Sequence, residues 1–368
     1  MSRKPGLRAA GTMLLGLMSA ACDGSTAPSI TESLDTDAAI EDFQALENVF
    51  ASEDWAAFQA LGGRTPFGAA SASIEVAGAL AGAATRDGGL SLTSTLVDRV
   101  VAAHADFDEA PALGPIISGW HRGSTFVYDP STDEYEPDLT REGAPATGVR
   151  FIVYAVDPAG VPIIAEERGY ADLIDEGDGS AEDIALRLRV VMGDETVLDY
   201  LTTLDHDATS GALSVGGFLA GDGARLDFDI RAAAREADGV TLLDVDFDLA
   251  VEARGFSITG AVRGIEDGAE DDGGSVDITV RHRSDSLRVD MTGADGLLDG
   301  SVYLNDRLFA TVQGPEDDLV FLGADGHPLR PGEILVLHRI VDVIEDAFDF
   351  LEDLIDPVDE IVLLGVIL

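Results

Sequence analysis

Lysine is almost absent from this sequence. Lys4 is the only one, and 69 acidic residues stand against 23 basic residues, which gives a formal net charge of −46. A field of this sign repels polyanions, so the composition excludes nucleic acid as a partner and disfavours anionic lipid headgroups. Long apolar runs are also missing, because Ala9–Leu17 and Ile361–Leu368 are both too short to span a bilayer.

Cysteine is the second scarce residue, with Cys22 as its only copy. The body of the chain therefore cannot contain an internal disulfide, and its stability must come from burial of apolar side chains. A hydrophobic fraction of 46% over 368 residues indicates a packed core rather than disorder. The sequence also lacks Gly-x-Ser-x-Gly, His-Glu-x-x-His and a phosphate-binding glycine loop, which are short motifs of enzymes and nucleotide-binding proteins.

Cys22 ends a segment that has the features of a secretory signal. Three basic residues open the segment, Ala9–Leu17 form its apolar core, and Met18–Cys22 place small residues before the cysteine. Met18–Cys22 resembles the lipobox of bacterial lipoproteins, although Ser19 stands where that family most often has Leu. The resemblance implies that the signal peptide 1–21 is removed. It also implies that Cys22 becomes an N-terminus carrying fatty acids such as palmitate, which anchors the protein in the cell envelope. The alternative is an ordinary secreted protein that is cut nearby.

The anchor is followed by a polar stretch and a helical region. Residues 22–35 are rich in Ser, Thr, Pro and Gly and predict a flexible tether. Residues 36–110 predict helices, most clearly over Thr36–Leu61, with a break near Ala51–Asp54 and an end at Gly62-Gly63. The apolar stripe of this segment contains Ile40, Phe43, Leu46, Val49 and Phe50, and after the break Trp55, Phe58 and Leu61.

From residue 111 to residue 330, apolar and polar residues alternate, which is the period of a strand. Leu226–Ile230 and Leu243–Leu249 alternate apolar and acidic residues strictly, so one face of the sheet should lie on a core and the other in water. Turn-forming residues separate short segments, and the connections leave no room for crossover helices. The pattern predicts a long antiparallel meander of about ten strands, curled into a half-barrel, closed into a barrel or folded into a sandwich. The strand-like segments include 124–128, 149–156, 161–165, 184–191, 196–204, 212–219, 224–232, 240–253, 256–263, 275–283, 286–291, 300–304, 308–313 and 319–322.

The C-terminal segment, residues 331–368, predicts a long amphipathic helix and a short apolar tail. Pro331 opens the helix and Pro357 ends it. Its apolar residues recur at spacings of three and four, and mainly acidic residues fill the other face. A stripe this wide needs a concave apolar partner, so we expect the helix to pack on the concave face of the sheet. The stripe contains Ile334, Leu337, Val341, Ile344, Phe348, Leu351 and Ile355.

Three acidic turns are candidate calcium sites, because calcium binds clustered carboxylates on tight loops. They are Asp175–Gly179, Asp205–Asp207 and Glu266–Gly274, and none has the helix–loop–helix calcium spacing. In a chain with 69 acidic residues, such clusters arise by chance, so we expect no metal site. His206 between two aspartates resembles part of a metal site, but its position favours a solvated turn.

Two further groups each allow two interpretations. Arg281-His282-Arg283 with Arg288 is a basic patch that either captures an anionic group or pairs with carboxylates of neighbouring strands. Trp120, Phe126 and Tyr128 form either an aromatic platform for a sugar or peptide or part of the core at the first hairpin. Ion pairing and core packing are the favoured interpretations.

These features predict a mainly β protein with flanking helices, divided into the signal 1–21, the tether 22–35, the helical region 36–110, the β domain 111–330 and the C-terminal segment 331–368. We expect a non-enzymatic envelope lipoprotein with a structural or binding role and no cofactor. Its partners would be the membrane, through the lipid on Cys22, and an envelope protein or apolar ligand. One alternative is a carrier of lipid or another apolar molecule in a half-barrel cavity, by fold analogy with carriers of the bacterial envelope. A hydrolase without a known motif is the other.

Overall fold

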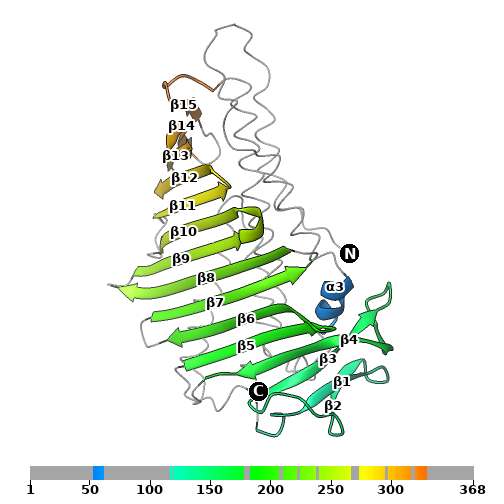
Figure 1. Ribbon diagram of the computed structural model, residues 1–368. Coiled ribbons are helices and arrows are strands. Elements are labelled where there is room, and N and C mark those ends of the chain that lie inside the picture. The colour runs from blue at the N-terminus through cyan, green and yellow to red at the C-terminus, as the bar shows by residue number, and fades with distance from the viewer. Residues whose placement is uncertain are drawn as a thin grey trace.

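The computed structural model describes residues 53–61, 117, 119–177, 183–206, 210–221, 224–237, 240–266, 273–294, 297–315 and 320–329. These residues form the helix α3 (Glu53–Gln59), a short 3-10 turn, η2 (Glu252–Arg254), and fifteen strands of one sheet (Figure 1). The strands are β1 (Thr125–Asp129), β2 (Glu134–Asp138), β3 (Gly148–Val156), β4 (Pro162–Asp175), β5 (Asp183–Met192), β6 (Glu195–His206), β7 (Ser210–Gly221), β8 (Ala224–Ala237), β9 (Val240–Val251), β10 (Phe256–Glu266), β11 (Gly273–His282), β12 (Asp285–Ala294), β13 (Leu297–Leu304), β14 (Arg307–Pro315) and β15 (Val320–Gly323).

The predicted meander is confirmed over most of the sheet. From β3 to β15, every strand pairs antiparallel with the next strand in the sequence. The expected number of about ten strands was too low. Each of the fourteen strand-like segments overlaps a separate strand of the sheet, and Glu134–Asp138 adds a fifteenth that its charged sequence did not suggest.

The purely antiparallel arrangement is wrong at one place. β1 pairs antiparallel with β2 but parallel with β3, and the sheet order ends β3-β1-β2. Residues 139–147 leave β2 at the end where β1 begins and pass to the other side of β1. A loop of this length can cross one strand position, since neighbouring strands lie only about 4.8 Å apart.

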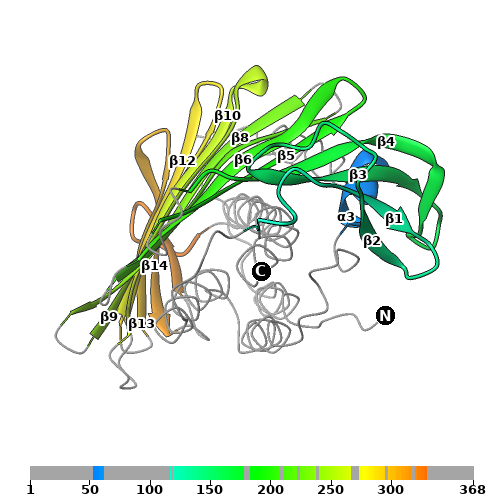
Figure 2. The same cartoon turned by 90° about the horizontal axis from the view of Figure 1, so that it is seen from below.

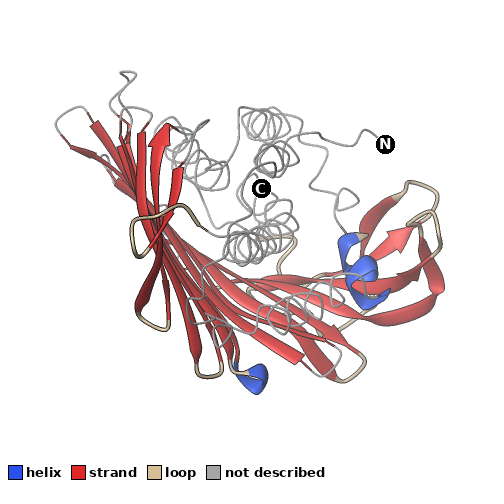
Figure 3. Ribbon diagram, turned by 90° about the horizontal axis from the view of Figure 1, so that it is seen from above, coloured by secondary structure: helices blue, strands red, loops and turns tan. Residues whose placement is uncertain are grey.

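The sheet is curved and open (Figures 2 and 3). β2 and β15 are its two edges and do not pair with each other. The closed-barrel alternative is therefore wrong. The sandwich alternative is wrong as well, because all fifteen described strands belong to one sheet.

The alternation of apolar and polar residues sets the two faces of the sheet, as predicted. In the β8–β9 pair, Ile230 lies opposite Phe247 on the buried face. Asp229 lies opposite Asp248 on the other face, where both side chains are exposed. Because side chains alternate along a strand, this register repeats across neighbouring pairs and leaves one apolar and one polar face.

Helix α3 packs against β3 and β4 at the β1–β4 end of the sheet (Figures 1 and 3). The predicted apolar positions Phe58 and Leu61 are buried in the same hydrophobic cluster as the apolar face of the sheet. Glu53 and Asp54, at the end of the predicted break Ala51–Asp54, are helical, and residues 51–52 lie outside the described residues. The signal peptide, the tether, the rest of the helical region and the C-terminal helix lie outside the described residues.

Candidate functional site

A row of neighbouring aromatic rings runs from the surface into the core at the β1–β4 end. Trp120, at its outer end, is 85% exposed, whereas Phe126 and Tyr128 are buried. The aromatic platform of these three residues is therefore wrong, and core packing is confirmed for Phe126 and Tyr128. In order, the row consists of Trp120, His121, Phe126, Phe151, Tyr135 and Tyr128, with neighbouring ring centroids 5.2–6.2 Å apart.

The turn that carries Trp120 is held by an arginine. Arg122 donates from Nε to the carbonyl oxygen of Ile117 at 2.9 Å and from Nη2 to Asp175 Oδ2 at 2.7 Å. The backbone N–H of Ser124 donates to the carbonyl of His121 at 2.9 Å. Asp175 is buried, so this ion pair fixes the turn against the end of β4 and holds the indole of Trp120 outward.

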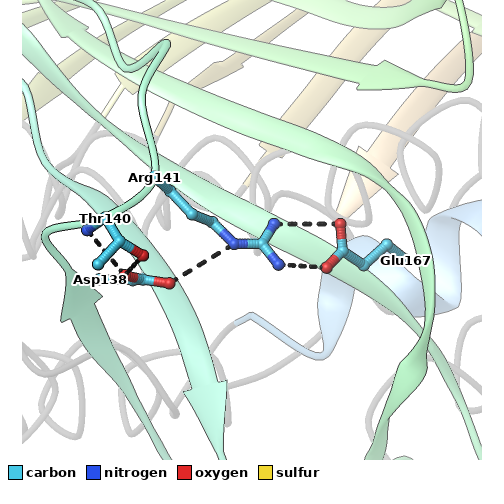
Figure 4. A network of polar contacts seen from close by, with 4 residues as sticks. All are labelled: Asp138, Thr140, Arg141 and Glu167. Atoms are coloured by element: carbon cyan, nitrogen blue, oxygen red, sulfur yellow. Dashed lines mark hydrogen bonds and ion pairs between the residues drawn. The ribbon is translucent and has the colours of Figure 1, made fainter.

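The loop after β2 is held by a second polar network (Figure 4). The N–H and the hydroxyl of Thr140 both donate to Asp138 Oδ1, at 2.9 and 2.6 Å. These bonds lower the pKa of Asp138, the hydroxyl contributing most, and they form an Asx-turn that places Leu139 at its tip. Leu139 is 87% exposed.

Arg141 connects this turn to β4. Its guanidinium donates to both carboxylate oxygens of Glu167 in a fork, and its Nε lies 3.7 Å from Asp138 Oδ2. The hydrogen bonds from Arg141 lower the pKa of Glu167. Arg141 lies in the loop between β2 and β3, so this contact joins that loop to β4.

An ion pair with a buried carboxylate lies beside this network. Arg150 on β3 and Asp172 on β4 are register partners, and the guanidinium donates to the two carboxylate oxygens at 2.6 and 2.8 Å. The same guanidinium lies 3.6 Å from the ring centroid of Tyr170. Asp172 is only 5% exposed, so the fork satisfies a carboxylate that would otherwise be very costly to bury.

The three candidate calcium turns are described only in part, and in two of them the described residues have other partners or lie in a strand. Asp175 is bound by Arg122, and Glu176 accepts from Arg187 Nε at 2.7 Å. Asp205 and His206 are not in a turn, because β6 continues through both and pairs with β7. Asp207 and most of the segment Glu266–Gly274 lie outside the described residues. Within the described ranges, no three His, Cys, Asp or Glu side chains are grouped to hold a metal ion.

The predicted basic patch is divided by the sheet. His282 is buried and Arg281 is exposed, because consecutive residues of β11 point to opposite faces. Arg288 lies 3.4 Å from Asp290 Oδ2 and its guanidinium carbon 4.4 Å from the ring centroid of Tyr303. Arg288 therefore pairs with a carboxylate, as the favoured interpretation expected, but Asp290 lies on its own strand β12 and not on a neighbouring strand.

One pair of acidic residues was not predicted. Asp277 and Asp290 are direct partners in the β11–β12 pair. Burial and the neighbouring Asp290 carboxylate raise the pKa of Asp277. The pair could have been predicted from the tight turn at Arg283-Ser284, because a two-residue turn sets the register that places Asp277 opposite Asp290.

Among known proteins, no family model, curated protein or solved structure matches this chain. None of the helical segments that the structure describes has the length and hydropathy of a membrane span. At the β1–β4 end, the described contacts pair Asp138, Asp172, Asp175 and Glu167 with arginines.

Proposed function

We propose that the protein is a non-enzymatic lipoprotein of the bacterial cell envelope, held on a membrane by fatty acids on Cys22, with a folded body of structural or binding role. The observation that carries the proposal is the only cysteine of the chain at the end of Met18–Cys22, directly after a basic and apolar leader. The body adds support through its rigid β1–β4 end, where two large apolar side chains face solvent on arginine-braced turns.

Fatty-acid labelling in a bacterial host tests the anchor. Cys22→Ala should abolish incorporation of labelled palmitate and release the protein from the membrane fraction. Ser19→Leu is the matched control, because it brings the segment closer to the family pattern and should keep or increase labelling. Equal labelling of Cys22→Ala and the parent chain would overturn the proposal.

For the architecture, we propose that the helix predicted after Pro331 covers the apolar concave face of the sheet. Two features support this arrangement. Its predicted stripe is apolar over many turns, and a single sheet with a buried apolar face needs a second layer. The acidic opposite face of the predicted helix would then point to water.

The second candidate function is a carrier of lipid or another apolar molecule. The observation that favours it is the extent of the apolar face, which runs from Leu188 on β5 through Phe228 on β8 to Ala310 on β14. Native mass spectrometry of protein purified from its own host tests this function. A co-purifying lipid would favour the carrier, and its consistent absence would favour the structural or binding role.

A further inference from the structure

We propose that Trp120 and Leu139 form an apolar tip that inserts into the membrane surface to which Cys22 anchors the chain. The inference rests on the proposed lipid anchor. It adds that the body touches the bilayer at a defined place, with the β1–β4 end of the sheet facing the membrane.

The two side chains emerge at the same end of one hairpin. Thr125, the first residue of β1, lies opposite Asp138, the last residue of β2. Trp120 lies in the turn before β1, and Leu139 directly follows β2. At 85% and 87%, they are the two most exposed large hydrophobic side chains among the described residues.

Both side chains are held outward by fixed turns. Arg122 braces the turn of Trp120 through Asp175, and the indole stacks on His121 at 6.2 Å. Leu139 sits on the Asx-turn of Asp138. A rigid apolar group loses little conformational freedom on insertion, so these turns are organised in advance for contact with an apolar phase.

The position of the N-terminal chain identifies the membrane as the occupant. Glu53, where α3 begins, pairs with Arg168 at 3.1 Å. Arg168 adjoins Glu167, whose clamp on Arg141 holds the Leu139 turn. The segment that leads from Cys22 therefore joins the body at β4, in the same β1–β4 end of the sheet that carries the tip. Its 53 − 22 = 31 residues span at most roughly 100 Å, which keeps the body near the anchored lipid.

Ion pairs near the tip offset part of the negative charge, so a membrane surface can approach this end of the sheet. The whole chain carries a net charge of −46, but near the tip Arg122 pairs with Asp175 and Arg141 with Glu167. Tryptophan is favoured at the level of the headgroups, where the ring is buried and the indole N–H meets water. The structure therefore fits an uncharged phospholipid surface.

Quenching by brominated lipid tests the contact. The lipidated protein is reconstituted in phosphatidylcholine vesicles with brominated acyl chains, in a Trp55→Phe background that leaves Trp120 as the only tryptophan. We expect strong quenching of Trp120. Leu139→Ser should reduce the quenching severalfold, because loss of a leucine side chain weakens insertion by roughly tenfold.

The matched control is Leu297→Ser. Leu297 is also exposed, at 57%, but lies on β13 towards the other edge of the sheet, so this change should leave quenching unaltered. Thermal melting should be unchanged in both serine variants, because both leucines are exposed.

The possible results distinguish failure of the proposed tip contact from failure of the proposed lipid anchor. If the protein floats with the vesicles but Trp120 is unquenched, the anchor stands and the tip contact is wrong. If Trp120 is shielded from acrylamide in native envelopes but not quenched by bromolipid, a protein partner covers the tip and the inference is overturned. If the protein does not float with the vesicles, both proposals are wrong.

Discussion

Asp277 and Asp290 stand directly opposite each other across the β11–β12 pair. Asp290 Oδ1 is buried and receives no hydrogen bond from any described group. A proton on Asp277 would supply the missing donor. Burial and the neighbouring carboxylate raise the pKa of Asp277, and only Arg288 opposes the shift. Asp277 therefore holds a proton more readily than an isolated aspartate and can share it with Asp290.

This pair predicts a loss of stability as the pH rises. Because the pKa of Asp277 is raised in the folded state, the stabilising contribution is complete below the pKa of an unfolded aspartate. It is lost as the pH rises through the raised pKa. Asp277→Asn supplies a permanent N–H donor, so it should increase the free energy of unfolding at pH 7 by about 0.2–1 kcal/mol and have no such effect at low pH.

Urea unfolding at several pH values measures this difference. Asp194→Asn is the control, because it removes the same charge at an exposed turn between β5 and β6 and should not change the shape of the pH profile. An identical profile for Asp277→Asn and the parent chain would contradict the shared proton.

The Arg150–Asp172 pair predicts a large loss of stability when it is broken. Asp172→Ala leaves the partly buried Arg150 guanidinium without its carboxylate, which should cost about 3 kcal/mol, the low end for a buried pair. Glu167→Ala is the matched control, because the Arg141–Glu167 pair is 37% and 44% exposed and should be worth about 0–1 kcal/mol. The unfolding midpoint in urea measures both. Equal losses would show that burial does not distinguish the two pairs.

Thr202 predicts a stabilising substitution. Its side chain is 3% exposed on the apolar face, and its hydroxyl has no hydrogen-bond partner among the described residues. Thr202→Val should therefore raise the free energy of unfolding by about 1 kcal/mol. Thr203→Val, on the partly exposed opposite face, should change it little. If Thr202→Val instead destabilises the protein, the Thr202 hydroxyl forms a hydrogen bond with a group outside the described residues or with water.

Phe348 tests the proposed C-terminal layer. If the predicted helix covers the sheet, Phe348→Ala should lower the free energy of unfolding of the unlipidated protein by about 3–5 kcal/mol. Asp349→Ala, on the predicted polar face, is the control and should have little effect. Thermal melting measures both. Deletion of residues 333–368 that left stability unchanged but reduced vesicle binding would assign the helix to the membrane.

Much of the sheet was predictable because it depends on local pattern. In Leu226–Ile230 and Leu243–Leu249, the period of two determined both the strand and the face that each side chain occupies. Tight turns then determined the antiparallel pairing from β3 to β15, since a short connection can only return the chain beside the strand it has just left.

The candidate site depended on contacts that no local pattern contains. The sequence shows Trp120 and Phe126 as neighbouring aromatic residues, yet only the tertiary structure places one in solvent and the other in the core. The charge of Arg141 is visible in the sequence. Its ion pair with Glu167, 26 residues away in the sequence, forms because the chain crosses β1 between β2 and β3. Such pairings are decided by which strands meet when the apolar face is buried, and burial is a property of the whole sheet rather than of any one segment.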